Sequence, residues 1–184
     1  MLYNSKLKMN CILNYVKLIF LFLLFTFTSC DLYFCSYETG AKEYKEFVET
    51  PSNNLDEMYQ QFSRYSVEQQ IDIYLYARNC PDNPQIQKFL VKDGENKIPA
   101  IVERIKKERI RDKYFLMTIL LDINRNCGCI KKDSEIIKTL ESIKQEIGAD
   151  KDISSNDIYT QGYSDSLKTL KEQIDKQNSV SETK

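Results

Sequence analysis

The sequence predicts an all-α protein, folded as an irregular antiparallel bundle of helices. Apolar residues recur at helical spacing between residues 55 and 148, and Asn, Ser, Asp, Pro and Gly stand between these runs, where helices begin and end. No run of alternating apolar and polar residues reaches a convincing strand length. The ambiguous segment is IDIYLY at 71–76, and we expect it to be helical because a capping box precedes it.

Length and composition limit the classes of protein that fit. The chain has 184 residues, 42% of them hydrophobic and 29% charged, with only 5 Gly and 4 Pro. These values exclude a disordered, a collagen-like and a multi-span membrane protein. The chain contains no His, which is the commonest general acid or base near neutral pH and the commonest metal ligand. We therefore expect no enzyme, no cofactor and no metal site.

Residues 1–29 have the features of a signal peptide. Lys6, Lys8 and Lys17 give the segment a positive start without any acidic residue, and the apolar run LIFLFLLFTFT follows at 18–28. This run is shorter than the roughly 20 residues that a helix needs to cross a bilayer. Export of the remaining chain is therefore expected.

The leader ends in Phe27-Thr28-Ser29-Cys30, which resembles the lipobox of bacterial lipoproteins. The resemblance covers only the leader, and Phe27 stands where the family usually has Leu. It implies cleavage before Cys30, a diacylglyceryl group on the Cys30 thiol and a fatty acyl chain such as palmitate on its amine. A plain secreted protein, or an uncleaved anchor extended N-terminally to Cys11, is the alternative.

The same resemblance implies a location. A lipid-anchored chain would be held at the cell envelope and would face the periplasm. Asp31 resembles the signal that retains some lipoproteins in the inner membrane, so the inner membrane is favoured over the outer. The membrane, reached through the lipid on Cys30, is the first expected partner.

The charge balance argues against nucleic acid as a partner. Without the leader the chain carries 23 basic and 27 acidic residues, a net charge of about −4. Nucleic-acid surfaces need a clustered basic excess. The local exception is RIKKERIRDK at 104–113, which we interpret as a solvated helix surface with ion pairs between neighbouring turns.

Four cysteines remain after Cys11 in the leader and Cys30 at the lipidation point. In an exported domain these four suggest structural disulfides that staple the helices, and the candidates are Cys35, Cys80, Cys127 and Cys129. Cys127 and Cys129 stand too close in sequence for an easy mutual bridge. Cys80 is therefore the leading partner of Cys127, and Cys35 would then pair with Cys129. The sequence does not choose among the three complete pairings, and partial pairing or free thiols are the alternatives. A redox pair or metal site is disfavoured because the spacing is CxC without any His.

The helices follow in order from their start and stop signals. Residues 30–54 are expected to be a lipidated N-terminus and tether, with one helical turn around Ala41–Val48. Asn53 or Asn54 can cap a helix that runs to Arg64. The capping box Ser66-Val-Glu-Gln69 then opens a helix that ends near Asn79. Asn83-Pro84 begins the next helix and Gly94 ends it, and Pro99 opens another.

The second half of the chain contains the expected central helix. Residues 114–123 are apolar on nearly every side, which is typical of a surrounded helix. Asp133 caps a helix that Gly148 ends, so 55–148 is the predicted helical core domain. A linker and a loosely packed helix at Ser164–Lys176 make up 149–177, and 178–184 is expected to be a disordered tail.

Residues 66–147 are similar in pattern to one or two irregular HEAT-like helical pairs. This weak resemblance covers under half of the chain and carries no functional residue. It implies a short stack in two layers around 114–123, with a concave surface available to a partner.

No catalytic motif stands in the sequence, and tyrosines are the more informative residues. GxSxG, P-loop, GxGxxG and HExxH spacings are all absent. Tyrosine is favoured at protein interfaces because it buries a large area at low entropic cost while its hydroxyl keeps a polar contact. The candidate partner-binding residues are Tyr59, Tyr65, Tyr74 and Tyr76.

These features favour a membrane-anchored envelope lipoprotein with a non-catalytic, protein-binding helical domain. A specific version is an immunity-type protein that neutralises a toxin by occluding it. The alternative is a structural or assembly adaptor of the cell envelope, and an enzyme of unfamiliar type is a third hypothesis.

Overall fold

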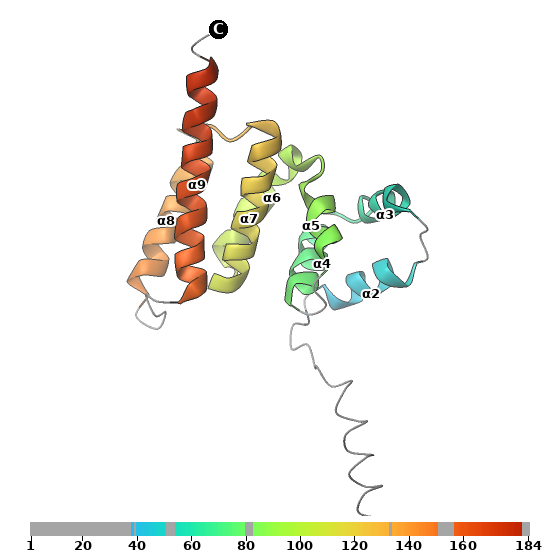
Figure 1. Cartoon of the computed structure of the whole chain (residues 1–184). Coiled ribbons are helices and arrows are strands. Elements are labelled where there is room, and N and C mark those ends of the chain that lie inside the picture. Colours follow the sequence, from blue (N-terminus) through green and yellow to red (C-terminus); the bar gives the residue numbers. More distant parts are fainter. Residues whose placement is uncertain are drawn as a thin grey trace, which may run out of the picture. The chain divides into compact units, whose positions relative to one another are not determined.

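A computed structural model describes residues 38, 40–50, 54–79, 83–132, 134–150 and 157–181. In this part of the chain all regular structure is helical, which confirms the all-α prediction (Figure 1). The helices are α2 (Ala41–Glu49), α3 (Leu55–Phe62), α4 (Val67–Asn79), α5 (Pro84–Val91), the 3-10 helix η1 (Gly94–Lys97), α6 (Ile98–Lys107), α7 (Ile110–Cys127), α8 (Glu135–Ala149) and α9 (Ile158–Ser181). The described residues form one compact unit.

Helix α2 lies where the sequence predicts helical structure, around Ala41–Val48, but it is longer than one turn and packs on the domain, so it is not part of a tether. It is a nine-residue helix that packs on α4, and its Phe47 is buried with ring centroids 5.8 Å from Phe62 and 6.5 Å from Phe89. Gly40 precedes the helix with φ +79° and approaches the α4 backbone at Asp72. A glycine permits both this left-handed conformation and this close approach. The helical unit therefore begins before residue 55.

The predicted capping signals of α3 and α4 are confirmed. The Asn54 side chain accepts a hydrogen bond from the Glu57 backbone N–H at 2.8 Å. The Gln69 N–H donates to Ser66 Oγ at 3.3 Å, and the Ser66 N–H donates to Gln69 Oε1 at 3.1 Å. This reciprocal capping box satisfies two backbone donors at the start of α4. The ambiguous segment at 71–76 lies inside α4 and is helical as expected.

The C-terminal end of α5 is capped by the buried side chain of Lys97, not by Gly94. Lys97 Nζ donates to the Phe89, Leu90 and Lys92 carbonyls at 3.3, 3.1 and 2.9 Å, which are free because they lie at the C-terminal end of the helix. Burial lowers the Lys97 pKa from 10.5 to about 8. Gly94 lies beyond α5, at the start of η1.

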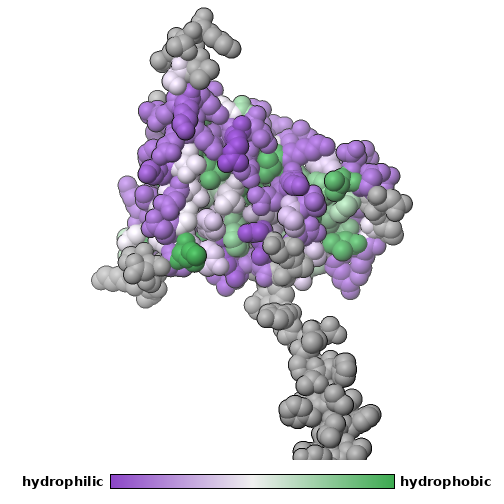
Figure 2. Space-filling model, in the orientation of Figure 1, coloured by the Kyte–Doolittle hydropathy of each residue, from purple (hydrophilic) through white to green (hydrophobic). Residues whose placement is uncertain are grey.

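Helix α7 is the central helix that the sequence predicts. It packs against α4, α5, α6, α9 and η1, and its buried side chains face these neighbours. Gly128, with φ +59°, ends it in a left-handed C-cap. Hydrophobic residues on the exposed face seen in Figure 2 form small, separate spots among hydrophilic ones. Within the described residues, no helix combines the length and hydrophobicity that a membrane span requires.

Helix α9 corrects two expectations about the C-terminus. It is a 24-residue helix that begins six residues before Ser164 and continues to Ser181, so the first part of the predicted tail is helical. Its contact with α7 is the most extensive between two elements of the described chain, so it is not loosely packed. Tyr163 is fully buried and donates its hydroxyl to the Leu140 carbonyl of α8 at 3.1 Å. Asp133, the predicted cap of α8, lies outside the described residues, and Ser134 stands at the N-cap.

Candidate partner-binding groove

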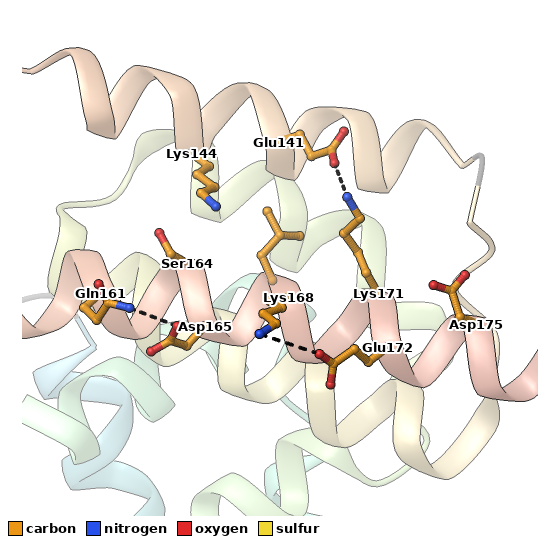
Figure 3. A pocket seen from close by; sticks show the side chains of 10 residues that line it. Glu141, Lys144, Gln161, Ser164, Asp165, Lys168, Lys171, Glu172 and Asp175 are labelled. Atoms are coloured by element: carbon orange, nitrogen blue, oxygen red, sulfur yellow. Dashed lines mark hydrogen bonds and ion pairs between the residues drawn. The ribbon is translucent and has the colours of Figure 1, made fainter.

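A groove of about 590 Å³ lies between α8 and α9 (Figure 3). Both helices turn an apolar stripe toward the core, with Leu140 and Ile143 on α8 and Leu167 and Leu170 on α9. Their polar residues therefore lie along the outer edges of the contact. The lining residues are Glu141, Lys144, Gln161, Ser164, Asp165, Leu167, Lys168, Lys171, Glu172 and Asp175.

Ion pairs organise the charged walls of this groove. Lys171 of α9 reaches Glu141 of α8 at 2.6 Å, which is the pair that spans the groove (Figure 3). Lys168 and Glu172 pair along α9 at 4.0 Å. Both pairs are solvent-exposed, so each contributes at most about 1 kcal/mol and can exchange for a pair with another molecule at little cost.

Among the described residues, Lys144 is the groove lysine that forms no ion pair. Its side chain extends from α8 toward α9 in Figure 3. Asp175, at the other end, pairs with Lys132 at 2.8 Å. The groove thus offers alternating charges of both signs above an apolar floor at Leu167, which is only 3% exposed.

Two further cavities have similar charged rims. One of about 460 Å³ lies between the start of α7 and the end of α8, lined by Glu108, Arg109, Ile110, Lys113, Ile143, Glu146, Ile147 and Asp150. Another, of about 430 Å³, lies between α5 and α7, lined by Pro84, Gln87, Lys88, Val91, Asp122, Arg125 and Asn126. Among the described residues no three Cys, Asp or Glu side chains are grouped so as to hold a metal ion.

The predicted tyrosines do not form one surface. Tyr74 is 1% exposed and donates its hydroxyl to the Phe115 carbonyl at 3.2 Å, so it is a core residue and cannot contact a partner. Burial raises its pKa to about 12. The prediction for Tyr74 is therefore wrong, because this side chain lies where α4 packs against α7.

The other three tyrosines are half-buried and lie in different neighbourhoods. Tyr59 donates to Asp93 at 2.7 Å and carries the Lys92 ammonium 3.8 Å from its ring centroid. Burial and the Asp93 carboxylate raise the Tyr59 pKa to about 12. Tyr76 packs on Tyr44 of α2, with ring centroids 5.1 Å apart. Burial raises the pKa of Tyr65, which lies before α4.

The cysteine pairing differs from the expected one. Cys127 is bonded to Cys129, with Cα atoms 5.1 Å apart, so Cys80 is not its partner and Cys35 is not the partner of Cys129. The left-handed turn at Gly128 brings the two thiols together, which sequence distance alone does not reveal. Cys30, Cys35 and Cys80 lie outside the described residues.

The basic run at 104–113 is largely occupied by internal contacts. Arg104 pairs with Glu108 and with Asp72, the latter at 2.6 Å, so it ties α6 to α4. Lys113 donates to the Ile105 and Lys106 carbonyls at 2.6 and 3.0 Å, at the end of α6. These contacts agree with the interpretation as a charged helix surface.

No residue of the groove was singled out by sequence reasoning. The available signal is the repeat of Lys, Asp and Glu three or four positions apart in 165–175, and such a repeat is common on solvated helices. No family model, curated protein or solved structure matches the chain.

Proposed function

We propose that the chain is a lipid-anchored protein of the bacterial cell envelope whose helical domain binds another protein without catalysing a reaction. The observation that supports this best is the groove between α8 and α9, whose walls carry charges of both signs. Sites for small molecules enclose their ligand in mostly apolar walls. Charged, solvent-accessible walls suit a protein surface of complementary charge, which they orient and select.

The anchor is supported by Phe27-Thr28-Ser29-Cys30. A diacylglyceryl group and an amide-linked acyl chain would hold the protein stably, whereas one chain alone gives marginal binding. Helix α2 begins at Ala41, and the ten residues between Cys30 and Ala41 extend at most about 35 Å. The helical domain would therefore work close to the membrane surface.

The specific version of this function is an immunity-type role. A small domain held at the membrane would meet an incoming toxin before it reaches its target and would occlude it by surface complementarity. The alternative is an adaptor that links envelope components. The two differ in a simple respect: loss of an immunity protein matters only when its toxin is present, whereas loss of an adaptor weakens the envelope without any toxin.

Replacing Lys144 with Glu is expected to reduce partner binding by about tenfold or more, because it reverses the one groove lysine without an ion pair among the described residues. The fold should keep its stability, since an exposed charge contributes little. The measurement is recovery of bound protein on the tagged full-length chain, cross-linked in its own membranes. Lys138→Glu is the matched control, because Lys138 is exposed on α8 outside the groove.

The pattern across the variants decides the proposal. A partner lost with Lys144→Glu and kept with Lys138→Glu supports the groove as the contact site. Equal recovery with both variants would place the contact elsewhere, and absence of any partner from wild type would contradict a binding function. Deletion of the gene, followed by growth with and without a toxin encoded by an adjacent gene, then separates immunity from adaptor: a defect only under toxin indicates immunity, and a defect without toxin indicates an adaptor.

A further inference from the structure

Two side chains meet at a buried point where α4 ends and α7 begins. Asp112, the third residue of α7, is 1% exposed. Asn79, the last residue of α4, donates from Nδ2 to Asp112 Oδ1 at 3.0 Å and to the Leu75 carbonyl at 2.7 Å. Both amide hydrogens of Asn79 are therefore used.

Two oxygens at this point have no hydrogen-bond donor among the residues that the structure describes. Within that part of the chain, Asn79 Oδ1 and Asp112 Oδ2 are both buried without a partner. Buried polar atoms are nearly always hydrogen-bonded, so two unsatisfied acceptors on two already bonded groups require an explanation. An ionised carboxylate and an amide oxygen are both acceptors only, and neither can satisfy the other.

We propose that Asp112 is protonated in the folded protein at neutral pH and that its Oδ2–H donates to Asn79 Oδ1. One proton, taken from solvent on folding, then satisfies both oxygens. With the existing Nδ2–H bond to Oδ1 it closes a reciprocal pair of a carboxylic acid and an amide. This pair joins α4 to α7, and it depends on the geometry of these helices, not on the proposed function.

The charges around Asp112 are compatible with this proton. Burial raises the Asp112 pKa and Glu108 raises it further, while the Asn79 bond and the charges of Arg111 and Arg109 oppose the rise without cancelling it. Arg111 Nε is 3.9 Å from Asp112 Oδ1, beyond hydrogen-bond distance, and its side chain is 41% exposed. From α4, the Arg78 guanidinium lies over the Phe115 ring, 4.8 Å from its centroid.

The pair makes the joint between α4 and α7 sensitive to pH. An aspartate has a pKa of about 3.9 in an unfolded chain. The pKa of Asp112 is higher in the folded protein than in the unfolded chain. Between these two pKa values the folded state therefore binds one more proton, and the free energy of unfolding falls as the pH rises through that range. The stabilisation that the Asp112–Asn79 pair gives the folded state is complete below about pH 4. It is lost once the pH passes the pKa of Asp112 in the folded protein. Ionisation then leaves a buried carboxylate facing an amide oxygen, which loosens the joint.

Asp112→Asn tests the proposal, because asparagine keeps the shape and supplies a permanent N–H at the Oδ2 position. The variant is expected to unfold at a higher urea concentration than wild type at about pH 8, and the difference should shrink toward about pH 4. Between these limits the wild-type unfolding constant should rise by up to tenfold per pH unit relative to the variant. Asp56→Asn is the control, since Asp56 is an exposed acid in the first turn of α3.

The carboxyl carbon resonance of Asp112 in the wild type gives a direct measurement. The proposal expects the chemical shift of a protonated acid at pH 7 and its titration only at higher pH. A carboxylate shift at pH 7 would overturn the proposal, as would a folded Asp112→Asn variant that is less stable than wild type at every pH. The Asp56→Asn control should show no stabilisation at high pH.

Discussion

Replacing Gly40 with alanine is expected to lower the free energy of unfolding by about 2–4 kcal/mol. Gly40 has φ +79°, which strains any residue with a side chain. An added Cβ would also overlap the carbonyl group of Asp72 and lie 3.0 Å from the Ile73 nitrogen. These atoms belong to the backbone of α4 and cannot move aside, so α2 would have to leave its site.

Chemical denaturation of Gly40→Ala and Gly148→Ala measures this effect against a matched control. Gly148 lies in α8, and an added Cβ there would meet no atom within 4 Å. Its replacement is expected to raise stability by up to about 1 kcal/mol, because alanine favours a helix over glycine. A Gly40→Ala variant as stable as wild type would mean that α2 is not docked on α4.

Leu170→Ala is expected to destabilise the protein by about 2–5 kcal/mol, the usual loss for emptying a leucine site in a well-packed core. Leu170 is fully buried on α9, the helix in most extensive contact with α7. The urea midpoint of the variant measures the loss. Thr169→Ala, at the exposed neighbouring position, should change stability by less than about 0.5 kcal/mol.

The comparison of these two variants tests whether α9 belongs to the core. If Leu170→Ala had no larger effect than Thr169→Ala, α9 would be a peripheral helix, as its polar sequence suggested. We expect the opposite, because removal of the fully buried Leu170 side chain leaves a cavity in the core that the surrounding helices fill only in part.

Local signals predicted most of the middle of the fold. The capping box at Ser66 and Gln69, the Asn83-Pro84 start and the apolar sequence of 114–123 each depend on neighbours in the chain, and each is in its expected place. Such signals act within one helical turn, so they can be recognised without knowledge of the tertiary structure.

The helices at the two ends of the domain, α2 and α9, were predicted less well, because they depend on tertiary contacts rather than on local signals. Gly162 weakens a helix prediction for 158–163, but in the structure an added Cβ there would lie 2.7 Å from the Tyr114 ring. The glycine therefore permits close packing of α9 on α7 rather than a break in the helix. Helix α2 similarly has a polar sequence with Phe47 as its buried residue, and Gly40 allows it to dock. Contacts across long sequence separations can override local propensity.

The candidate groove could not be predicted from the sequence either, because it also depends on tertiary contacts. Lys144 on α8 and Lys171 on α9 carry the charge pattern of ordinary solvated helices. Which of their faces remain open is decided by the packing of the two helices, in which Tyr163 of α9 donates to the Leu140 carbonyl of α8. The pairing of Cys127 with Cys129 likewise depends on the turn at Gly128, because spacing leaves several pairings possible.

The central claim is that the helical domain works at a membrane to which Cys30 anchors it. Mass spectrometry of the protein purified separately from the membrane and soluble fractions of its native cells tests this claim most directly, with Cys30→Ala as the variant that should leave the membrane fraction. The account predicts a first residue at Cys30 that carries a diacylglyceryl thioether and an acylated amine. A chain that still begins at Met1, with an unmodified Cys30 thiol and recovered from the soluble cell fraction, would contradict it.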